Sequence, residues 1–171
     1  STGKPKGVMV THKSWLATLF WTIGKFKFNE HHTHLAIAPV DTAVFLGDLF
    51  MALLSGGRVV LAPPNCARDM EALCRLIQHH RIGVANFVPT VIRYLAEENR
   101  FAGLTSLRCV FASGEAISGQ LAARVRRHTA LFHFYGLSEA ACVACREHGG
   151  REEEPELGEA TIHSLHCLAG D

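Results

Sequence analysis

The sequence lacks an excess of charge of either sign, a membrane-length apolar run and a dense set of cysteines. Its 17 lysines and arginines balance 16 aspartates and glutamates, giving a formal net charge of +1 at pH 7. A net charge this close to zero gives no indication that the chain binds nucleic acid or an anionic membrane. Six cysteines in 171 residues are too sparse for a small secreted disulfide scaffold. Because no secretory leader is evident either, we expect a soluble, cytoplasmic chain without a membrane partner.

What the sequence does contain is enough apolar material for one core. Hydrophobic residues make up 48% of it, which suits one domain or one substantial subdomain. Apolar β-branched runs alternate with segments of helical periodicity, and this predicts an α/β fold with a mostly parallel sheet flanked by helices. Ligands are expected at the carboxyl ends of its strands. The expected strands are residues 8–11, 35–38, 58–61, 84–88, 109–112 and 131–134, and the expected helices are residues 14–25, 45–54, 70–80, 90–99 and 120–128.

The composition changes towards the C-terminal end. Residues 146–157 are rich in charge and glycine, which predicts a solvated loop. We therefore expect a core subdomain in residues 1–145, this charged loop, and the start of a further strand segment in residues 158–171, with the strand itself in residues 160–168.

Three segments carry candidate chemistry. Residues 1–7 read Ser-Thr-Gly-Lys-Pro-Lys-Gly, and glycine amides, hydroxyls and a lysine ammonium together suit polyphosphate. By composition alone, a flexible basic surface loop explains this segment better. However, Gly-Glu-Ala at residues 114–116 and Tyr-Gly-Leu-Ser-Glu-Ala at residues 135–140 each follow a predicted strand.

In this order and spacing, the three segments resemble the adenylate-forming, or AMP-binding, superfamily, and most closely nonribosomal peptide synthetase adenylation domains and acyl-CoA ligases. Residues 50–57 and 86–90 resemble the family as well. The resemblance implies a fragment of the large N-terminal region of such an enzyme. It also implies ATP and Mg²⁺ as cofactors, a small carboxylic acid as substrate, and transfer of the acyl-AMP to a phosphopantetheine or CoA thiol. Expected partners are a carrier-protein domain and the remaining N- and C-terminal parts of the enzyme.

The resemblance also assigns roles to residues that match the family motifs. The residues expected to bind the nucleotide are Ser1, Thr2, Gly3, Lys6, Gly114, Glu115, Ala116, His133, Tyr135, Gly136 and Ser138. Among them Lys6 is the phosphate-binding cation and Tyr135 stacks on adenine. Lys6, Ser138 and Glu139 are the expected catalytic residues, and Glu139 is the expected Mg²⁺ ligand.

Two of these positions depart from the peptide-synthetase pattern, which usually carries Asn at His133 and Thr at Ser138. Both replacements keep a hydrogen-bonding group. A half-buried strand histidine without a ligand role explains His133 equally well. His12 matches a family histidine and is expected to cap or pack the following helix.

The same alignment predicts an acyl pocket. Its expected lining is Ala43, Val44, Gly47, Asn86, Phe111, Ser113, Phe134, Cys142 and Val143. Amino-acid-activating members carry Asp at the position of Ala43, where it pairs with the substrate ammonium, and a buried ammonium without a partner is costly. We therefore expect an acid without an α-amino group. Asp41 keeps an alternative open, because two extra residues before the helix would restore an amino-acid site.

Two other classes of function remain open. The first is a catalytically incomplete remnant that binds nucleotide without turnover. The family's ribose motif, hinge and mobile C-terminal domain lie beyond the matched residues, so we expect weak or no adenylation by residues 1–171 alone.

The second is a metal-binding protein, suggested by histidines at residues 31, 32, 34, 79 and 80 and by cysteines at residues 142 and 145. A zinc site needs four ligands at matched spacing, and one Cys-x-x-Cys pair supplies two. A solvated loop is the better explanation of the first histidine cluster.

Overall fold

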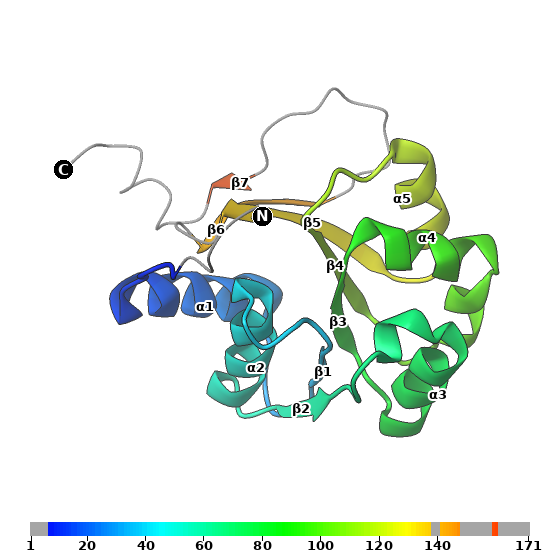
Figure 1. The fold of residues 1–171 in the computed structure, drawn as a ribbon, viewed down its shortest axis with the longest axis horizontal. Coiled ribbons are helices and arrows are strands. Elements are labelled where there is room, and N and C mark those ends of the chain that lie inside the picture. Colours follow the sequence, from blue (N-terminus) through cyan, green and yellow to red (C-terminus); the bar gives the residue numbers. More distant parts are fainter. Residues whose placement is uncertain (1–6, 138–140, 148–158, 161–171) are drawn as a thin grey trace.

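The computed structural model describes residues 7–137, 141–147 and 159–160. Its centre is a seven-stranded sheet in the order β2-β1-β3-β4-β5-β6-β7 (Figure 1). The strands are β1 (Thr33–Ala36), β2 (Arg58–Leu61), β3 (Val84–Phe87), β4 (Cys109–Ser113), β5 (Ala130–Leu137), β6 (Ala141–Glu147) and β7 (Glu159–Ala160). Strands β1 to β5 are parallel, whereas β6 and β7 pair antiparallel. The predicted α/β class with a mostly parallel sheet is confirmed.

Helices cover both faces of this sheet. They are α1 (His12–Phe26), α2 (Ala43–Leu54), α3 (Met70–His80), α4 (Pro89–Glu97) and α5 (Gly119–Val125), with short 3-10 turns η1 (Cys66–Arg68) and η2 (Arg100–Gly103). Helices α1 and α2 lie on one face, and α3, α4 and α5 lie on the other (Figure 1). Successive side chains of a strand point to opposite faces of the sheet, so each strand packs against both helical layers. In β4, Val110 packs towards α3–α5 and Phe111 packs towards α1.

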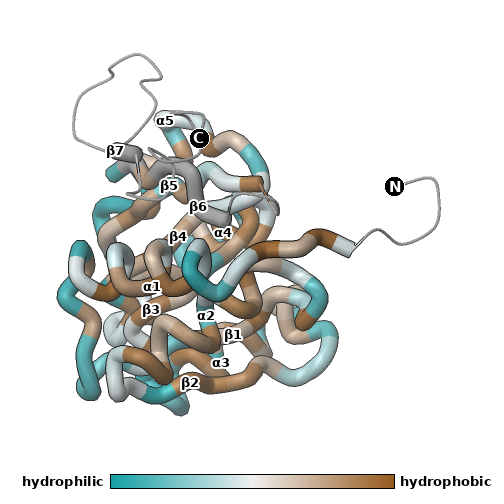
Figure 2. The backbone as a smooth tube through the Cα atoms, turned by 90° about the vertical axis from the view of Figure 1, so that its left-hand side faces the viewer, coloured by the Kyte–Doolittle hydropathy of each residue, from teal (hydrophilic) through white to brown (hydrophobic). Residues whose placement is uncertain are grey.

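The predicted strand at residues 8–11 is wrong. These residues form no strand, and Thr11 is instead the N-cap of α1, where its side chain accepts a hydrogen bond from Ser14 N–H. Figure 2 shows the segment running out from the packed body, and Met9 is 99% exposed. An apolar β-branched run favours extended backbone, but a strand also requires a neighbour to share its hydrogen bonds. His12 follows this cap as the first residue of the helix and is exposed.

Strand β6 was not predicted. It reverses direction after β5 and reaches Glu147, so the first two residues of the predicted charged loop are paired strand. Residues 148–157 of that loop lie outside the described residues. Strand β7 falls within the predicted C-terminal segment, but the rest of the strand expected at residues 160–168 is also outside them.

None of the helices described in the structure is long and apolar enough to cross a bilayer.

Helix α2 buries a carboxyl group. Asp48 is 3% exposed, and its Oδ2 has no hydrogen-bond partner among the described residues. Burial raises the pKa of Asp48 well above its ordinary value, since the interior disfavours the charged form. A carboxyl with a raised folded-state pKa stabilises the fold below its unfolded pKa. That stability is lost as the pH rises towards the folded pKa.

We therefore expect the Asp48→Asn variant, which cannot titrate there, to gain stability relative to the wild type as the pH rises from about 4 to about 8. Thermal unfolding of both proteins across this range measures the difference in Tm. A difference in Tm that stays constant with pH would contradict the assignment.

Candidate functional site

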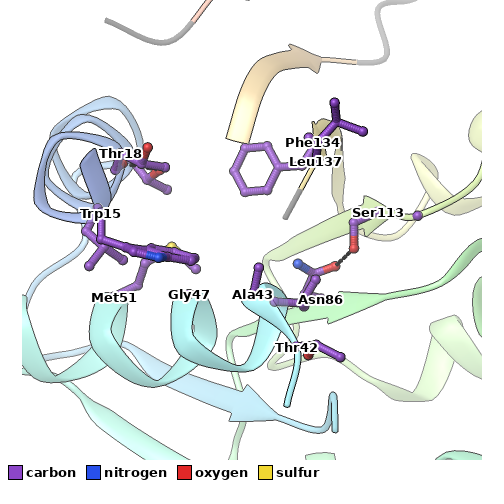
Figure 3. Close-up of a pocket in the computed structure, with 15 residues that line it drawn as sticks. Trp15, Thr18, Thr42, Ala43, Gly47, Met51, Asn86, Ser113, Phe134 and Leu137 are labelled. Carbon is purple, nitrogen blue, oxygen red and sulfur yellow. Dashed lines mark hydrogen bonds between the residues drawn. The ribbon is translucent and has the colours of Figure 1, made fainter. Parts of the chain in front are cut away.

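A cavity of about 220 Å³ opens at the carboxyl ends of β3, β4 and β5, against helices α1 and α2 (Figure 3). Its lining comes from α1 (Trp15, Thr18, Leu19, Thr22), from α2 and its cap (Thr42, Ala43, Val44, Gly47, Met51), and from the sheet and its turns (Asn86, Ser113, Gly114, Phe134, Gly136, Leu137). None of these lining residues is ionisable. The cavity is therefore suited to the uncharged part of a ligand.

The sheet contributes a fixed polar pair to this cavity. Asn86 and Ser113 sit at the ends of adjacent parallel strands and on the same face of the sheet, so their side chains meet. Ser113 Oγ donates to Asn86 Oδ1 at 2.8 Å, and both residues are buried. This hydrogen bond leaves the amide nitrogen of Asn86 pointing into the cavity (Figure 3).

The start of α2 decides which residue faces the cavity. Thr42 Oγ1 accepts a hydrogen bond from Phe45 N–H at 3.3 Å and donates to the carbonyl of Pro39 at 2.7 Å, which fixes the first helical residue as Ala43. Ala43 lines the cavity. Asp41 precedes the cap, is exposed and is not part of the described lining.

An aromatic wall closes one side of the cavity. The rings of Phe134 and Phe111 are stacked, with centroids 4.4 Å apart and planes 10° apart. Phe134 lines the cavity, whereas Phe111 is fully buried behind it and supports it. Phe26 packs edge-on against Phe111 at 5.0 Å and so ties α1 to the same cluster. Phe111 therefore contributes to the expected pocket through Phe134.

Two of the residues expected to bind the nucleotide, Gly114 and Gly136, contribute to the cavity, and others are their neighbours in sequence. Gly114 has a φ of +89°, a backbone conformation that favours glycine, and it turns the chain away from the end of β4. Gly114 and Gly136 line the cavity itself. Tyr135 is 53% exposed, in keeping with a ring available to a ligand. Glu115 and Ala116 are exposed in the same turn.

His133 is half-buried on β5, where its backbone is paired with Ala112 and Arg146. This position fits a ligand-binding histidine and a histidine without a ligand role equally well.

The structure therefore brings six of the nine expected acyl-pocket residues into one cavity: Ala43, Val44, Gly47, Asn86, Ser113 and Phe134. Cys142 and Val143 lie on β6, where their side chains are outside the described part of the chain. The expected phosphate, catalytic and Mg²⁺ residues Ser1, Thr2, Gly3, Lys6, Ser138 and Glu139 also lie outside the described residues.

The sequence patterns did not reveal the wall that α1 provides. Trp15, Thr18, Leu19 and Thr22 lie at the spacing of one helical face. That spacing was visible in the sequence. What it could not show is that this face of α1 meets the carboxyl ends of three strands far along the chain.

The histidines suggested as metal ligands do not converge. His34 is 1% exposed in β1, packs edge-on against Phe28 at 4.8 Å, and burial lowers its pKa to about 4. His32 Nδ1 lies 2.9 Å from Asn29 Oδ1, and His31 is exposed. The solvated-loop interpretation thus fails for His34, which belongs to the core. No group of three potential metal-binding side chains occurs in the part of the chain that the structure describes.

Comparison with known proteins identifies the family. Residues 1–164 match the sequence profile of the AMP-binding enzymes, so the chain belongs to this family and the resemblance is confirmed. It is 30% identical over 146 residues to tyrocidine synthase 3 of Brevibacillus parabrevis, covering 84% of this chain and 2% of that protein. It is 33% identical over 149 residues to vanchrobactin synthetase VabF of Vibrio anguillarum, covering 82% of this chain and 5% of that protein.

Solved structures share the fold. The Vibrio cholerae adenylation domain AlmE, solved in complex with glycyl-adenosine-5'-phosphate, superposes with a TM-score of 0.83 at 23% identity. That superposition covers 94% of this chain and 31% of AlmE. IdnL7 superposes with a TM-score of 0.76 at 27% identity, over 88% of this chain and 31% of that one. The chain thus spans about a third of these structures and a few per cent of the synthetases.

Proposed function

We propose that this chain forms the acid-binding part, and one side of the nucleotide site, of an ATP-dependent ligase that activates a carboxylic acid as its acyl-adenylate. The observation that carries the proposal is the uncharged cavity at the carboxyl ends of three parallel strands, bordered by the Gly114 turn and by Gly136. In open α/β sheets, ligands bind at this edge. Membership of the AMP-binding family supplies the reaction class.

In the proposed reaction, a substrate carboxylate oxygen attacks the α-phosphorus of ATP, and the bond to pyrophosphate breaks. The chain's own contribution is to hold the acid with its carboxylate towards the Gly114 end of the cavity, where the exposed ring of Tyr135 can stack on adenine. Lys6 is proposed to neutralise the leaving pyrophosphate, and Ser138 to bind the α-phosphate. Glu139 is proposed as the ligand of a Mg²⁺ ion, which would offset phosphate charge.

The proposed acid has no α-amino group. An α-ammonium buried in this cavity would meet Ala43 and no carboxylate among the described lining residues, and an unpaired buried charge is strongly disfavoured. Asp41, which would supply a carboxylate in a shifted alignment, precedes the helix cap and is exposed. The start of α2 at Ala43 therefore favours the ungapped alignment.

The second step and the partners are proposals of the same kind. The acyl-AMP would be captured by a phosphopantetheine or CoA thiol, whose sulfur attacks the acyl carbon as AMP leaves. Synthetases that carry the thiol on a carrier-protein domain fit the multidomain relatives of this chain. A cytoplasmic location remains a prediction of the sequence.

A nucleotide-binding fragment without turnover is the alternative. Residues 1–171 match 31% of AlmE, and catalysis also needs the groups that close over the bound nucleotide. We expect the polypeptide of residues 1–171 by itself to be weakly active or inactive, while a complete adenylation domain containing it turns over.

Acid-dependent ATP–pyrophosphate exchange by such a complete domain tests the proposed function. We expect incorporation of labelled pyrophosphate into ATP only when a suitable carboxylic acid is present, with the acyl-AMP detected by mass spectrometry. ATP binding without exchange for any acid in a broad panel would support the fragment without turnover instead.

A further inference from the structure

Helix α1 places one unusual hydroxyl at the cavity. Thr18 lines the cavity, is 5% exposed, and its Oγ1 has no hydrogen-bond partner among the described residues. Threonines inside helices often donate to the carbonyl one turn earlier, and Thr22 does so, with its Oγ1 2.8 Å from the carbonyl oxygen of Thr18. The Thr18 hydroxyl, in contrast, is unpaired within the described part of the chain. A buried hydroxyl without a partner is uncommon, and it destabilises the protein unless a ligand forms the missing hydrogen bond.

The rest of the cavity restricts what that ligand can be. Apart from the threonines of α1 and Thr42, the polar groups of its described lining are the indole N–H of Trp15 and the side chains of Asn86 and Ser113. The hydrogen bond between Ser113 and Asn86 leaves the Asn86 amide nitrogen facing the cavity. Between Thr18 and Asn86 the lining is mostly apolar, with Met51, Phe134 and the ring carbons of Trp15 as its large members. A ligand with an apolar middle and oxygen atoms at both ends, uncharged apart from its reacting carboxylate, matches this arrangement.

The direction of the ligand follows from the proposed function, on which this inference rests. The reacting carboxylate belongs at the Gly114 end, where the nucleotide would lie. Figure 3 shows Ser113, the neighbour of Gly114 in sequence, on one side of the cavity and Thr18 on the opposite side. Thr18 therefore meets the part of the acid that is remote from the carboxylate.

We infer that Thr18 is a specificity-determining residue: its hydroxyl hydrogen-bonds an uncharged oxygen substituent, a hydroxyl or carbonyl, at the end of the acid remote from the carboxylate. The favoured substrate is thus an acid that is uncharged apart from its carboxylate and carries a distal oxygen. An unsubstituted acid of the same length leaves the Thr18 hydroxyl buried and unpaired.

The test compares aliphatic and aryl acids with their distally hydroxylated counterparts, such as hexanoate with 6-hydroxyhexanoate and phenylacetate with 4-hydroxyphenylacetate. In ATP–pyrophosphate exchange by the complete domain, the hydroxylated member should be favoured in kcat/KM by roughly three- to tenfold or more. Thr18→Val should remove this preference, while Thr18→Ser, which restores a hydroxyl, should recover it.

Thr22→Val is the matched control. Thr22 lines the same cavity one turn along α1, but its hydroxyl is already bonded within the helix, so the preference for the hydroxylated acid should survive. Thr18→Val should also keep or raise the Tm, because it removes a buried unpaired hydroxyl. A loss of preference therefore cannot be attributed to unfolding.

Two results would overturn the inference while leaving the proposed function intact: equal use of hydroxylated and parent acids by the wild type, or a preference that survives Thr18→Val. If none of the acids in the panel supports exchange, the proposed function is overturned instead, and the inference with it.

Discussion

Replacement of Gly47 by tryptophan should remove the activity towards acids that reach across the cavity and should not destabilise the protein. Gly47 lies inside α2 and lines the cavity. A Cβ atom at this position would meet only Met51 Cε, at 3.9 Å, so the backbone has room for a side chain. Glycine inside a helix costs about 0.5–1 kcal/mol relative to alanine, and removing it supports the helix.

The indole of the Gly47→Trp variant would occupy the cavity of about 220 Å³. For acids that extend to the α1 wall, we expect kcat/KM in pyrophosphate exchange to fall by about 100-fold or more. Acids as short as acetate or propionate, if used by the wild type, should be affected far less. Thermal unfolding provides the accompanying measurement of stability.

Gly24→Ala is the control for the stability effect. Gly24 also lies in a helix and is exposed, and an added Cβ atom would meet no neighbouring group within 4 Å. This variant should be as stable as the wild type or more so, with unchanged kinetics. Undiminished use of long acids by Gly47→Trp would show that the cavity is not the acyl site.

Ala43→Asp has the second largest expected effect. It places a carboxylate in a cavity that has no ionisable group among its described lining residues. A substrate without an ammonium would leave this charge buried and unpaired, at a cost of about 3–5 kcal/mol, and kcat/KM should fall by roughly 10²- to 10⁴-fold. Amino acids should gain activity relative to their deaminated analogues, since their ammonium would pair with the new carboxylate.

The fold should tolerate Ala43→Asp, because position 43 is the first residue of α2. An acidic side chain in the first turn of a helix is favoured by the helix dipole. Ala43→Asn, which has nearly the same size but no charge, separates the effect of charge from that of volume. If the Asn variant loses as much activity as the Asp variant, the loss comes from side-chain volume and not from a carboxylate left without an ammonium partner.

Local signals predicted two elements of the fold to the residue. Strand β2 and helix α3 begin and end where the sequence placed them. Strand β2 lies between Gly56-Gly57 and Pro63-Pro64, and Asp69 caps α3 by accepting a hydrogen bond from Ala72 N–H at 2.9 Å. Such turn and cap residues act on their own neighbours, so they can be recognised without knowledge of the rest of the chain.

Pairing between distant segments was not predictable in the same way. Residues 8–11 have the composition of a strand but no neighbouring strand, whereas β6 has no distinctive strand pattern and pairs with the long strand β5. The local preference of a strand is weak, and its partner decides whether it forms.

The candidate site shows the same difference between what local motifs predict and what depends on contacts between distant segments. Family motifs located Asn86, Ser113 and Phe134, which the structure brings together in one cavity. The roles of Thr18 and of the α1 wall depend on which face of a helix meets the end of the sheet. The sequence pattern alone does not contain that information.

The most direct test of the central claim is ATP–pyrophosphate exchange by the complete adenylation domain, with amino acids compared against the same acids lacking the α-amino group. The structure places Ala43 in the cavity and leaves Asp41 outside its described lining. We predict exchange with the deaminated acids and little or none with the amino acids. Exchange with amino acids alone would contradict the account.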